Sequence, residues 1–240
     1  MSLQIHPLPA LKDNYIYALN NGLGQCAVID PGEATPVLNF LKLRNLKLSH
    51  ILCTHHHWDH INGVAELAEK FKVPVYCSAY DQTRIPAEPL ALGEDQPFHL
   101  LGEEVLTFSV PGHTLGQIAF WLPKMNALFV GDTLFSCGCG RLFEGSPAQM
   151  YESLQKIKSL PPQTQIFFGH EYTVNNLNFL RAQGIENAFV ANYRKQCEEK
   201  ILAGLPTSPG LLETELKVNP FLQARSVEEF RKWRDARDVW

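Results

Sequence analysis

A short segment of the chain concentrates side chains that bind divalent metal ions. Residues 54–60 read Thr-His-His-His-Trp-Asp-His, so four histidines and one aspartate fall within seven positions. Imidazole and carboxylate groups are the usual ligands of zinc and iron. Because alternate residues of an extended loop point the same way, His55 and His57 can bind one ion together. Asp59 and His60 begin a second set of ligands. One ion rarely takes four ligands from so short a loop, so two ions that share the segment are the easier arrangement.

Three more candidate ligands stand where apolar runs end. His113, Asp132 and His170 each follow a glycine that terminates such a run. Glycine turns a chain sharply, so the next side chain is displayed at the end of the preceding strand. Taken singly, such a residue more often caps a turn than binds a metal. The recurrence of glycine, histidine or aspartate at four strand ends favours one metal centre over chance.

The elements that must position these side chains follow from hydrophobic patterning. Alternating apolar residues and turn signals predict strands at residues 3–8, 14–19, 25–29, 49–54, 75–77, 105–110, 118–122, 127–130 and 165–168. Helical spacing of apolar residues predicts helices over 34–43 and 61–71. The histidine-rich segment is therefore predicted to be the loop between a strand and a helix. Residues 81–96 are rich in proline and glycine and are predicted to be loop.

The balance of elements changes near residue 171. Beyond it the sequence predicts helices, clearest at 191–202 and 227–237, and no convincing strand. Arg234 and Arg237 lie three residues apart on the last helix, so they share one side of it. We therefore expect a strand-rich part followed by a smaller helical part.

Composition narrows the class of protein. The 240 residues suit one large domain or two modest ones, and 45% hydrophobic with 19% charged residues is typical of a globular enzyme. A net charge of −4 argues against nucleic acid as a partner. The sequence shows neither a membrane-spanning apolar run nor a signal peptide, and its six scattered cysteines are expected to be reduced thiols. We therefore expect a cytoplasmic protein with no membrane partner. Separately from these features, we expect a monomer.

The motifs around these candidates resemble the metallo-β-lactamase superfamily and, within it, the glyoxalase II family of hydroxyacylglutathione hydrolases. The histidine-rich segment carries the superfamily resemblance. The narrower resemblance rests on Gly131-Asp132-Thr133-Leu134-Phe135, Cys139-Gly140-Arg141, Phe168-Gly169-His170-Glu171-Tyr172-Thr173 and Asn219-Pro220-Phe221-Leu222. It implies an α+β fold, with a four-layer αββα catalytic domain over residues 1–170. A small α-helical substrate-binding domain would occupy residues 171–240.

The resemblance also implies which side chains bind metal. Seven ligands would hold two divalent ions: His55, His57 and His113 on the first, Asp59, His60 and His170 on the second, and Asp132 on both. Zinc is the expected metal, with iron or manganese as alternatives, because such sites accept all three. His56 and Trp58 would point elsewhere and serve packing.

The implied substrate is a 2-hydroxyacyl thioester of glutathione, typically S-D-lactoylglutathione. Its hydrolysis to D-lactate and glutathione is the second step of methylglyoxal detoxification. A hydroxide shared by the two ions would attack the thioester, with Asp59 and Asp132 as catalytic residues, and the thiolate would leave with little acid assistance. The substrate would be bound by Arg141, Phe143, Tyr172, Arg234 and Arg237. Phe143 stands where the family often has tyrosine, so a hydroxyl contact is lost there.

Two other classes of protein share part of this pattern. A mononuclear iron dioxygenase acting on glutathione persulfide has the same histidine-rich segment but leaves part of the second ligand set unused. A non-enzymatic metal-binding module would hold metal without turnover. A β-lactamase or a nuclease needs no glutathione contacts, and a serine hydrolase is disfavoured because the sequence has no Gly-x-Ser-x-Gly motif. The thioesterase is the hypothesis that accounts for all the motifs.

Overall fold

The computed structural model describes residues 3–94 and 97–240. Within them the chain forms two compact units. Unit 1 holds the residues up to Ser109 together with Gly116–Gly131, and unit 2 holds Val110–Leu115 together with Asp132–Trp240. Across the described ranges, none of the helices combines the length and apolar character needed to cross a membrane.

Unit 1 is built around a mixed sheet with the strand order β1-β2-β3-β4-β5-β6. The strands are β1 (Gln4–Ala10), β2 (Asn14–Asn20), β3 (Gln25–Ile29), β4 (Lys47–Leu52), β5 (Val75–Ser78) and β6 (Leu90–Leu92). The first three pair antiparallel, as short turns allow, and β3 to β6 pair parallel. Parallel pairs need crossovers, which α1 (Ala34–Arg44), α2 (Trp58–Ile61) and α3 (Val64–Phe71) supply between β3 and β5.

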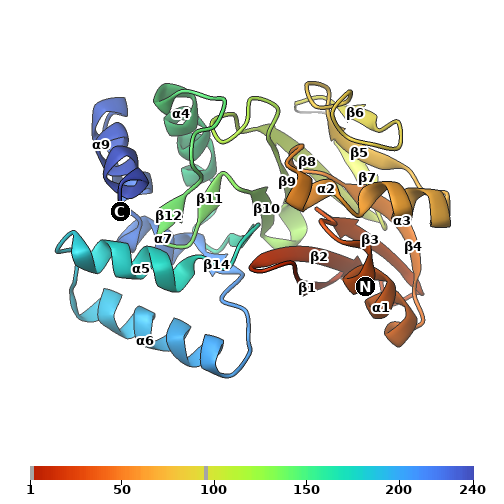
Figure 1. Ribbon diagram of the computed structural model, residues 1–240, viewed down its shortest axis with the longest axis horizontal. Helices are drawn as coiled ribbons and strands as arrows, with labels where there is room; N and C mark the ends of the chain where they lie inside the picture. The colour runs from red at the N-terminus through yellow and green to blue at the C-terminus, as the bar shows by residue number, and fades with distance from the viewer. Residues whose placement is uncertain (1–2, 95–96) are drawn as a thin grey trace. The chain divides into compact units, whose positions relative to one another are not determined.

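Helices α1 and α3 cover one face of this sheet (Figure 1). Buried Val37 and Leu67 from the two helices belong to the same apolar cluster as Val28 and Ile51 from the central strands. Strands buried by such a helical layer are apolar along much of their length, as β3 is after its first residue, whereas β4 is buried and apolar only at Leu48, Ile51 and Leu52. This core fixes the ends of β3 and β4, where the histidine-rich segment begins.

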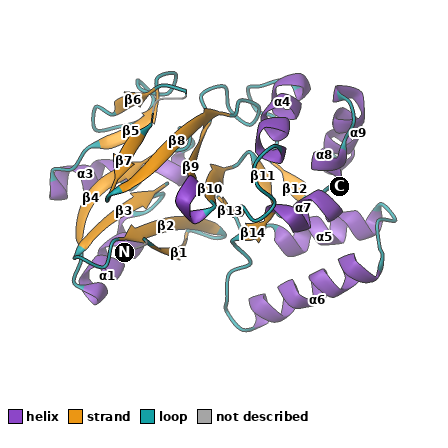
Figure 2. Cartoon of the chain, turned by 180° about the vertical axis from the view of Figure 1, so that it is seen from behind, coloured by secondary structure: helices purple, strands orange, loops and turns teal. Residues whose placement is uncertain are grey.

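A second sheet packs against the first within unit 1. Its strands there are β7 (Phe98–Leu100), β8 (Glu103–Ser109), β9 (Ile118–Leu122) and β10 (Ala127–Gly131), each antiparallel to the next. The ring centroids of Tyr17 and Phe129 lie 5.3 Å apart, and those of Tyr76 and Phe98 lie 5.5 Å apart, so aromatic contacts join the two sheets. Unit 1 is therefore a helical layer and two stacked sheets, seen from behind in Figure 2.

Unit 2 is mainly helical. Its helices are α4 (Pro147–Lys158), α5 (Thr173–Ala182), α6 (Ala188–Leu202), α7 (Leu212–Val218), α8 (Pro220–Gln223) and α9 (Val227–Asp238). Helices α5 and α6 run side by side, as do α4 and α9 (Figures 1 and 2). A hairpin joins β11 (Leu134–Phe135) to β12 (Gly138–Cys139), and β13 (Gln165–Phe168) pairs with β14 (Gly210–Leu211).

The α+β character predicted from the sequence is confirmed, but several elements differ. The predicted helix over 61–71 begins earlier, at Trp58, and is broken at Gly63. A Cβ atom at Gly63 would lie 2.7 Å from the carbonyl oxygen of Pro31, so the close approach of the turn after β3 explains the break. The helical part does contain a strand, β14, because its residues pair with β13 from far along the chain. Strands β6, β7, β11 and β12 and helix α4 were not predicted.

Candidate metal centre and substrate pocket

In unit 1 the histidine-rich segment is anchored by Asp30, which follows β3. The parallel pairing of Ile29 with Leu52 brings the ends of β3 and β4 together. Asp30 then accepts hydrogen bonds from the Thr54 backbone N–H (2.7 Å) and from the Thr54 hydroxyl (2.6 Å). Its Oδ2 also lies 3.1 Å from Nδ1 of His60. One buried carboxylate therefore fixes both ends of the segment.

These contacts orient the imidazole rings. The Thr54 hydroxyl gives its proton to Asp30, so it accepts from Nδ1–H of His55, 3.0 Å away. His60 likewise directs Nδ1–H to Asp30, and in both rings the lone pair is left on Nε2. The ring centroid of His55 lies 4.7 Å from that of His57 and 4.2 Å from that of His60. Three imidazoles thus gather at this end of unit 1.

Asp30 itself is better placed to orient ligands than to be one. Ligand atoms of Asp30, His55 and His60 all lie within 4.8 Å of one another, which would allow these three to hold an ion. However, the Asp30 carboxylate already accepts hydrogen bonds from Thr54 and His60, and it faces the Nδ1 side of the His60 ring rather than the Nε2 side. We assign Asp30 to positioning the metal ligands.

Asp59 is held by a side chain from a strand 45 residues earlier in the sequence. The side-chain amide of Asn14, at the start of β2, donates to the Asp59 carboxylate (2.9 Å) and lies 3.2 Å from the Asp59 carbonyl oxygen. A Cβ atom at Gly32 would lie 1.8 Å from that same carbonyl oxygen, so the turn after β3 must be glycine to pass this close. Asn14 and Gly32 together fix the first turn of α2.

His56 and Trp58 lie on the other side of the segment. Nδ1 of His56 lies 3.1 Å from the fully buried carboxylate of Asp81, which Arg84 approaches to 3.6 Å. The Trp58 side chain is 63% exposed. Among the described residues, neither belongs to a group of side chains whose ligand atoms lie close enough together to hold one ion.

Unit 2 gathers the remaining three candidates. His113 precedes β9, Asp132 follows β10, and His170 follows β13. Nε2 of His113 lies 3.4 Å from Oδ2 of Asp132, and Nε2 of His170 lies 3.2 Å from the same oxygen. All three residues are buried. Asp132 therefore lies at the centre of this group, and the imidazole rings of His113 and His170 both contact its carboxylate.

The donor sets in both units fit a divalent cation. His113 donates Nδ1–H to the carbonyl oxygen of Arg141 (2.8 Å), so its Nε2 is an acceptor, yet it faces an Asp132 oxygen, also an acceptor. In unit 1, Nε2 of His60 faces the Asp59 carboxylate at 3.6 Å in the same way. Two acceptors turned toward each other repel, and a cation bound by both removes the conflict.

A cavity of about 290 Å³ in unit 2 contains most of the candidate substrate contacts. Nine residues line it: Phe135, Cys139, Arg141, Tyr172, Asn176, Arg234, Arg237, Asp238 and Trp240. The Tyr172 ring stacks on the His170 ring at 4.8 Å with an interplanar angle of 4°, so this wall of the cavity adjoins a candidate metal ligand. Burial, and then the neighbouring guanidinium of Arg234, lower the pKa of Arg237. The charge of a bound anion would offset both effects, and the cavity therefore suits an anionic group.

The candidate arginines differ in what they already contact. Arg234 is buried, and it donates to the carbonyl oxygen of Cys139 (2.8 Å) and to Asp238 (3.0 Å). Arg237 makes a weaker contact with Asn176 (3.4 Å) and lies over the Trp240 ring. Arg141 is half exposed, with its Nε 3.3 Å from Asp238. Arg237 and Arg141 are therefore the more available to a ligand.

Phe143 lies outside the residues that line this cavity. Its side chain is 61% exposed, and its ring meets the His113 ring edge-on at 5.2 Å. The contact places Phe143 beside a candidate metal ligand of unit 2. A tyrosine there would add a hydroxyl without replacing any contact that the phenyl ring makes.

Three residues that shape the site were not predicted as functional: Asn14, Asp30 and Asp81. Asp30 directly follows the strand predicted at residues 25–29. Its signal was available, since an aspartate that ends one parallel strand lies beside the residues that end the next. Asn14 and Asp81 act through tertiary contacts with Asp59 and His56, which no local pattern reveals.

Comparisons with known proteins identify the family of the chain. Residues 12–170 match the family described as the metallo-beta-lactamase superfamily, and residues 171–240 match the hydroxyacylglutathione hydrolase C-terminus. A hydroxyacylglutathione hydrolase of Pelagibacter ubique is 42% identical over 237 residues, covering 98% of this chain and 99% of the relative.

Solved structures share the fold. ETHE1 from Myxococcus xanthus aligns with a TM-score of 0.74 at 23% identity, covering 98% of this chain and 90% of the other. The protein TTHA1623, in a di-iron-bound form, aligns with a TM-score of 0.67 at 26% identity, covering 90% of this chain and 99% of the other. The predicted superfamily fold is thereby confirmed. The chain belongs to the metallo-β-lactamase superfamily and, within it, to the hydroxyacylglutathione hydrolase family.

Proposed function

We propose that this protein hydrolyses the thioester of S-(2-hydroxyacyl)glutathione, typically S-D-lactoylglutathione, to the free 2-hydroxy acid and glutathione. The observation that carries this proposal is the match of both families end to end along one chain, residues 12–170 and then 171–240. The superfamily supports many chemistries, whereas the C-terminal match is specific to the thioester hydrolases. The activity is the second step of methylglyoxal detoxification.

The proposed cofactor is a pair of divalent ions, with zinc as the expected metal. The ligands are those expected from the sequence: His55, His57 and His113 for one ion, Asp59, His60 and His170 for the other, and Asp132 for both. The facing acceptors in each unit support metal binding. A structural relative in a di-iron-bound form supports a dinuclear centre. When bound, such ions supply Lewis acidity and lower the pKa of water toward neutrality.

The chain's own residues hold this chemistry in place. Asn14 donates to Asp59 and so leaves that carboxylate fewer orientations. The Arg141 carbonyl and the Asp30 carboxylate fix the Nδ1–H atoms of His113 and His60, which keeps their Nε2 lone pairs available. The leaving group needs little help from a proton donor, because a thiol pKa near 8.5 lets the thiolate depart unprotonated.

The unit 2 cavity is the proposed site for the glutathione part of the substrate. Glutathione carries two carboxylates, and the guanidinium groups of Arg141 and Arg237 can pair with them. Tyr172 would lie between the peptide and the metal ligand on which it stacks. On this proposal, residues 171–240 are a substrate-binding domain that follows a catalytic domain of residues 1–170.

The proposed location is the cytoplasm. All six cysteines are free thiols and all are buried. Proteins of the reducing cytosol keep their cysteines in this form, and glutathione is abundant there.

The test is hydrolysis of S-D-lactoylglutathione by purified protein, followed as loss of the thioester absorbance, with elemental analysis of the same sample. We expect turnover together with bound divalent metal. A sample that oxidises glutathione persulfide with one iron per chain, and leaves the thioester intact, would identify the dioxygenase instead. Metal without either reaction would identify a binding module. The matched variant is Asp132→Ala, which should lose both turnover and metal.

A further inference from the structure

The turn between β11 and β12 is held by buried side chains from the helical part of unit 2. Glu215, on α7, is 1% exposed, and its carboxylate accepts from the Ser136 hydroxyl (2.6 Å) and from the Cys137 backbone N–H (2.7 Å). Asn219, at the end of the same helix, lies 3.2 Å from the Phe135 carbonyl oxygen and 3.0 Å from that of Gly138. The polar backbone groups of this turn are thus satisfied by side chains rather than by solvent.

The turn needs this support because its conformation is unfavourable. Cys137 has a φ of 59°, in the left-handed region that usually requires glycine. A residue with a side chain persists there only when its surroundings enforce the conformation. The Glu215 carboxylate meets the N–H of this residue directly. Because Glu215 is buried, its carboxylate has lost solvent and depends on the donors around it, and burial raises its pKa.

The β11–β12 turn also fixes the walls of the substrate cavity. On its first strand, the Phe135 ring packs against the rings of Tyr172 (5.2 Å) and His170 (6.0 Å). On its second strand, the Cys139 carbonyl oxygen accepts from Arg234. Two residues further on is Arg141. The hairpin therefore carries or contacts side chains on several sides of the cavity.

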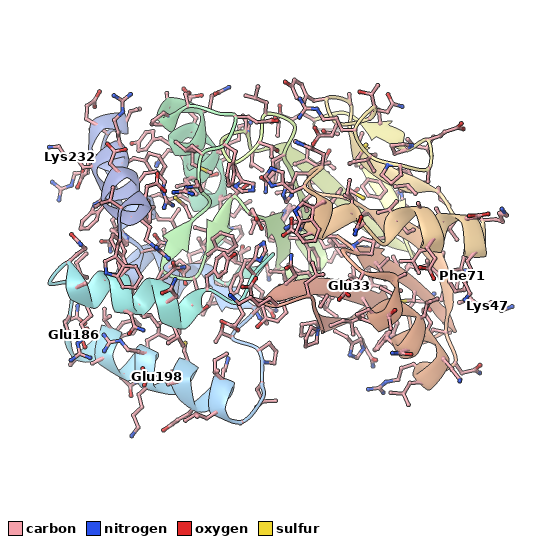
Figure 3. The ribbon with its side chains drawn as sticks, viewed as in Figure 1. Glu33, Lys47, Phe71, Glu186, Glu198 and Lys232 are labelled. Atoms are coloured by element: carbon pink, nitrogen blue, oxygen red, sulfur yellow. The ribbon has the colours of Figure 1, made fainter. Side chains whose placement is uncertain are left out.

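A third side chain links the turn to Arg237. The side-chain amide of Asn176 donates to the Ser136 carbonyl oxygen (3.0 Å), and its oxygen accepts from Arg237 (3.4 Å). A Cβ atom at Gly138 would lie 2.5 Å from the Asn176 amide, so this contact leaves no room for adjustment. By contrast, Lys232 on α9 points outward and away from this network (Figure 3).

We propose that Glu215 is a positioning residue for substrate binding: with Asn219 and Asn176 it holds the Phe135–Gly138 turn in the conformation that shapes the glutathione cavity. This inference rests on the proposed function, because it assigns a purpose to the same cavity. It also gives a role to the Asn219-Pro220-Phe221 motif, which no metal or substrate contact explains. Asn219 caps α8 through Phe221 N–H while its amide reaches the turn.

The test compares Glu215→Ala with Glu213→Ala. Glu213 lies on the same helix, but its side chain is exposed and pairs with Lys217 one turn away. Loss of Glu215 should raise KM for S-D-lactoylglutathione about tenfold and change kcat by less than about threefold, with metal content unchanged. Glu213→Ala should leave both constants as in the wild type. Equal KM values for the two variants would overturn the proposal.

A rescue separates positioning from general stability. Glycine adopts positive φ freely, so Cys137→Gly in the Glu215→Ala background should recover much of the lost KM, whereas Cys137→Ala should not. Equal effects of glycine and alanine at this position would refute the role assigned to the turn. If Glu215→Ala does not fold, Asn219→Ser replaces it, because serine keeps the helix cap and removes the contacts to the turn. That variant should show the same rise in KM.

The same samples distinguish failure of this inference from failure of the proposed function. A wild-type protein without thioester turnover would overturn the function, and glutathione binding measured by calorimetry would then report on the cavity alone. Binding should weaken about tenfold in Glu215→Ala relative to Glu213→Ala. Equal glutathione affinity in these two variants, or no binding by the wild type, would overturn the inference.

Discussion

Asn14 offers a sharp test of how the first half of the metal centre is built. Its side-chain amide donates to the Asp59 carboxylate at 2.9 Å and reaches the Asp59 carbonyl oxygen at 3.2 Å. Alanine at this position removes both contacts and leaves every candidate ligand side chain in the sequence unchanged. Asp59 would then lose its fixed orientation, and the free energy of metal binding should become less favourable.

The size of the effect follows from the kind of hydrogen bond. A bond to a charged group contributes about 1.5–3 kcal/mol, and each 1.4 kcal/mol corresponds to about a tenfold change in a binding constant. Loss of a residue that orients a metal ligand typically costs about 10- to 100-fold in affinity. We therefore expect Asn14→Ala to weaken binding of at least one zinc ion by about 10- to 100-fold, measured by competition with a chromogenic chelator.

The matched control is Asn20→Ala. Asn20 lies at the other end of β2 and is 6% exposed, as Asn14 is, but its amide contacts Gln4 and His6 rather than a ligand. Both variants lose buried hydrogen bonds and should have similar melting temperatures without metal. Only Asn14→Ala should bind zinc more weakly. Equal zinc affinity in the two variants would show that Asp59 needs no help from Asn14.

Three further outcomes follow from the same geometry. His56→Ala should keep most of the metal that His57→Ala loses, by elemental analysis, because His56 is held by Asp81; equal loss from both would contradict the loop geometry. Arg237→Ala should raise KM for lactoylglutathione about tenfold with little change in kcat or melting temperature. An unchanged KM would show that Arg237 does not bind the substrate. Ellman's reagent at pH 8 should detect few thiols in the folded protein and all six after unfolding, because all six are buried. Burial also raises the pKa of Cys26 and Cys77 to about 12, which keeps these thiols protonated. Rapid reaction of the folded protein with the reagent would argue against this burial.

Local sequence patterns are sufficient to predict the candidate ligands and the strands that end beside them. Candidate ligands were recognisable because histidine and aspartate stood where apolar runs ended in glycine. The family resemblance was confirmed by the match of both family descriptions along the chain. Strands β9 and β13 were predicted to the residue, since apolar runs bounded by turn residues leave little freedom.

Features set by distant contacts were not recoverable in this way. The break between α2 and α3 arises where Gly63 passes the turn after β3, and the two-residue strand β14 exists only through its pairing with β13. Glu215 looks in the sequence like one more acidic residue of an exposed helix, yet it is buried against Ser136, far away along the chain. The partners of such groups become visible only once the fold has brought them together.

Titration of metal-free protein with zinc tests the central claim most directly. S-D-lactoylglutathione hydrolysis is measured against the number of ions bound per chain, counted by elemental analysis after removal of unbound metal. We predict that hydrolysis rises until about two ions are bound and then stays constant, as a dinuclear mechanism requires. Full activity at one ion per chain, or bound metal without hydrolysis at any loading, would contradict the account.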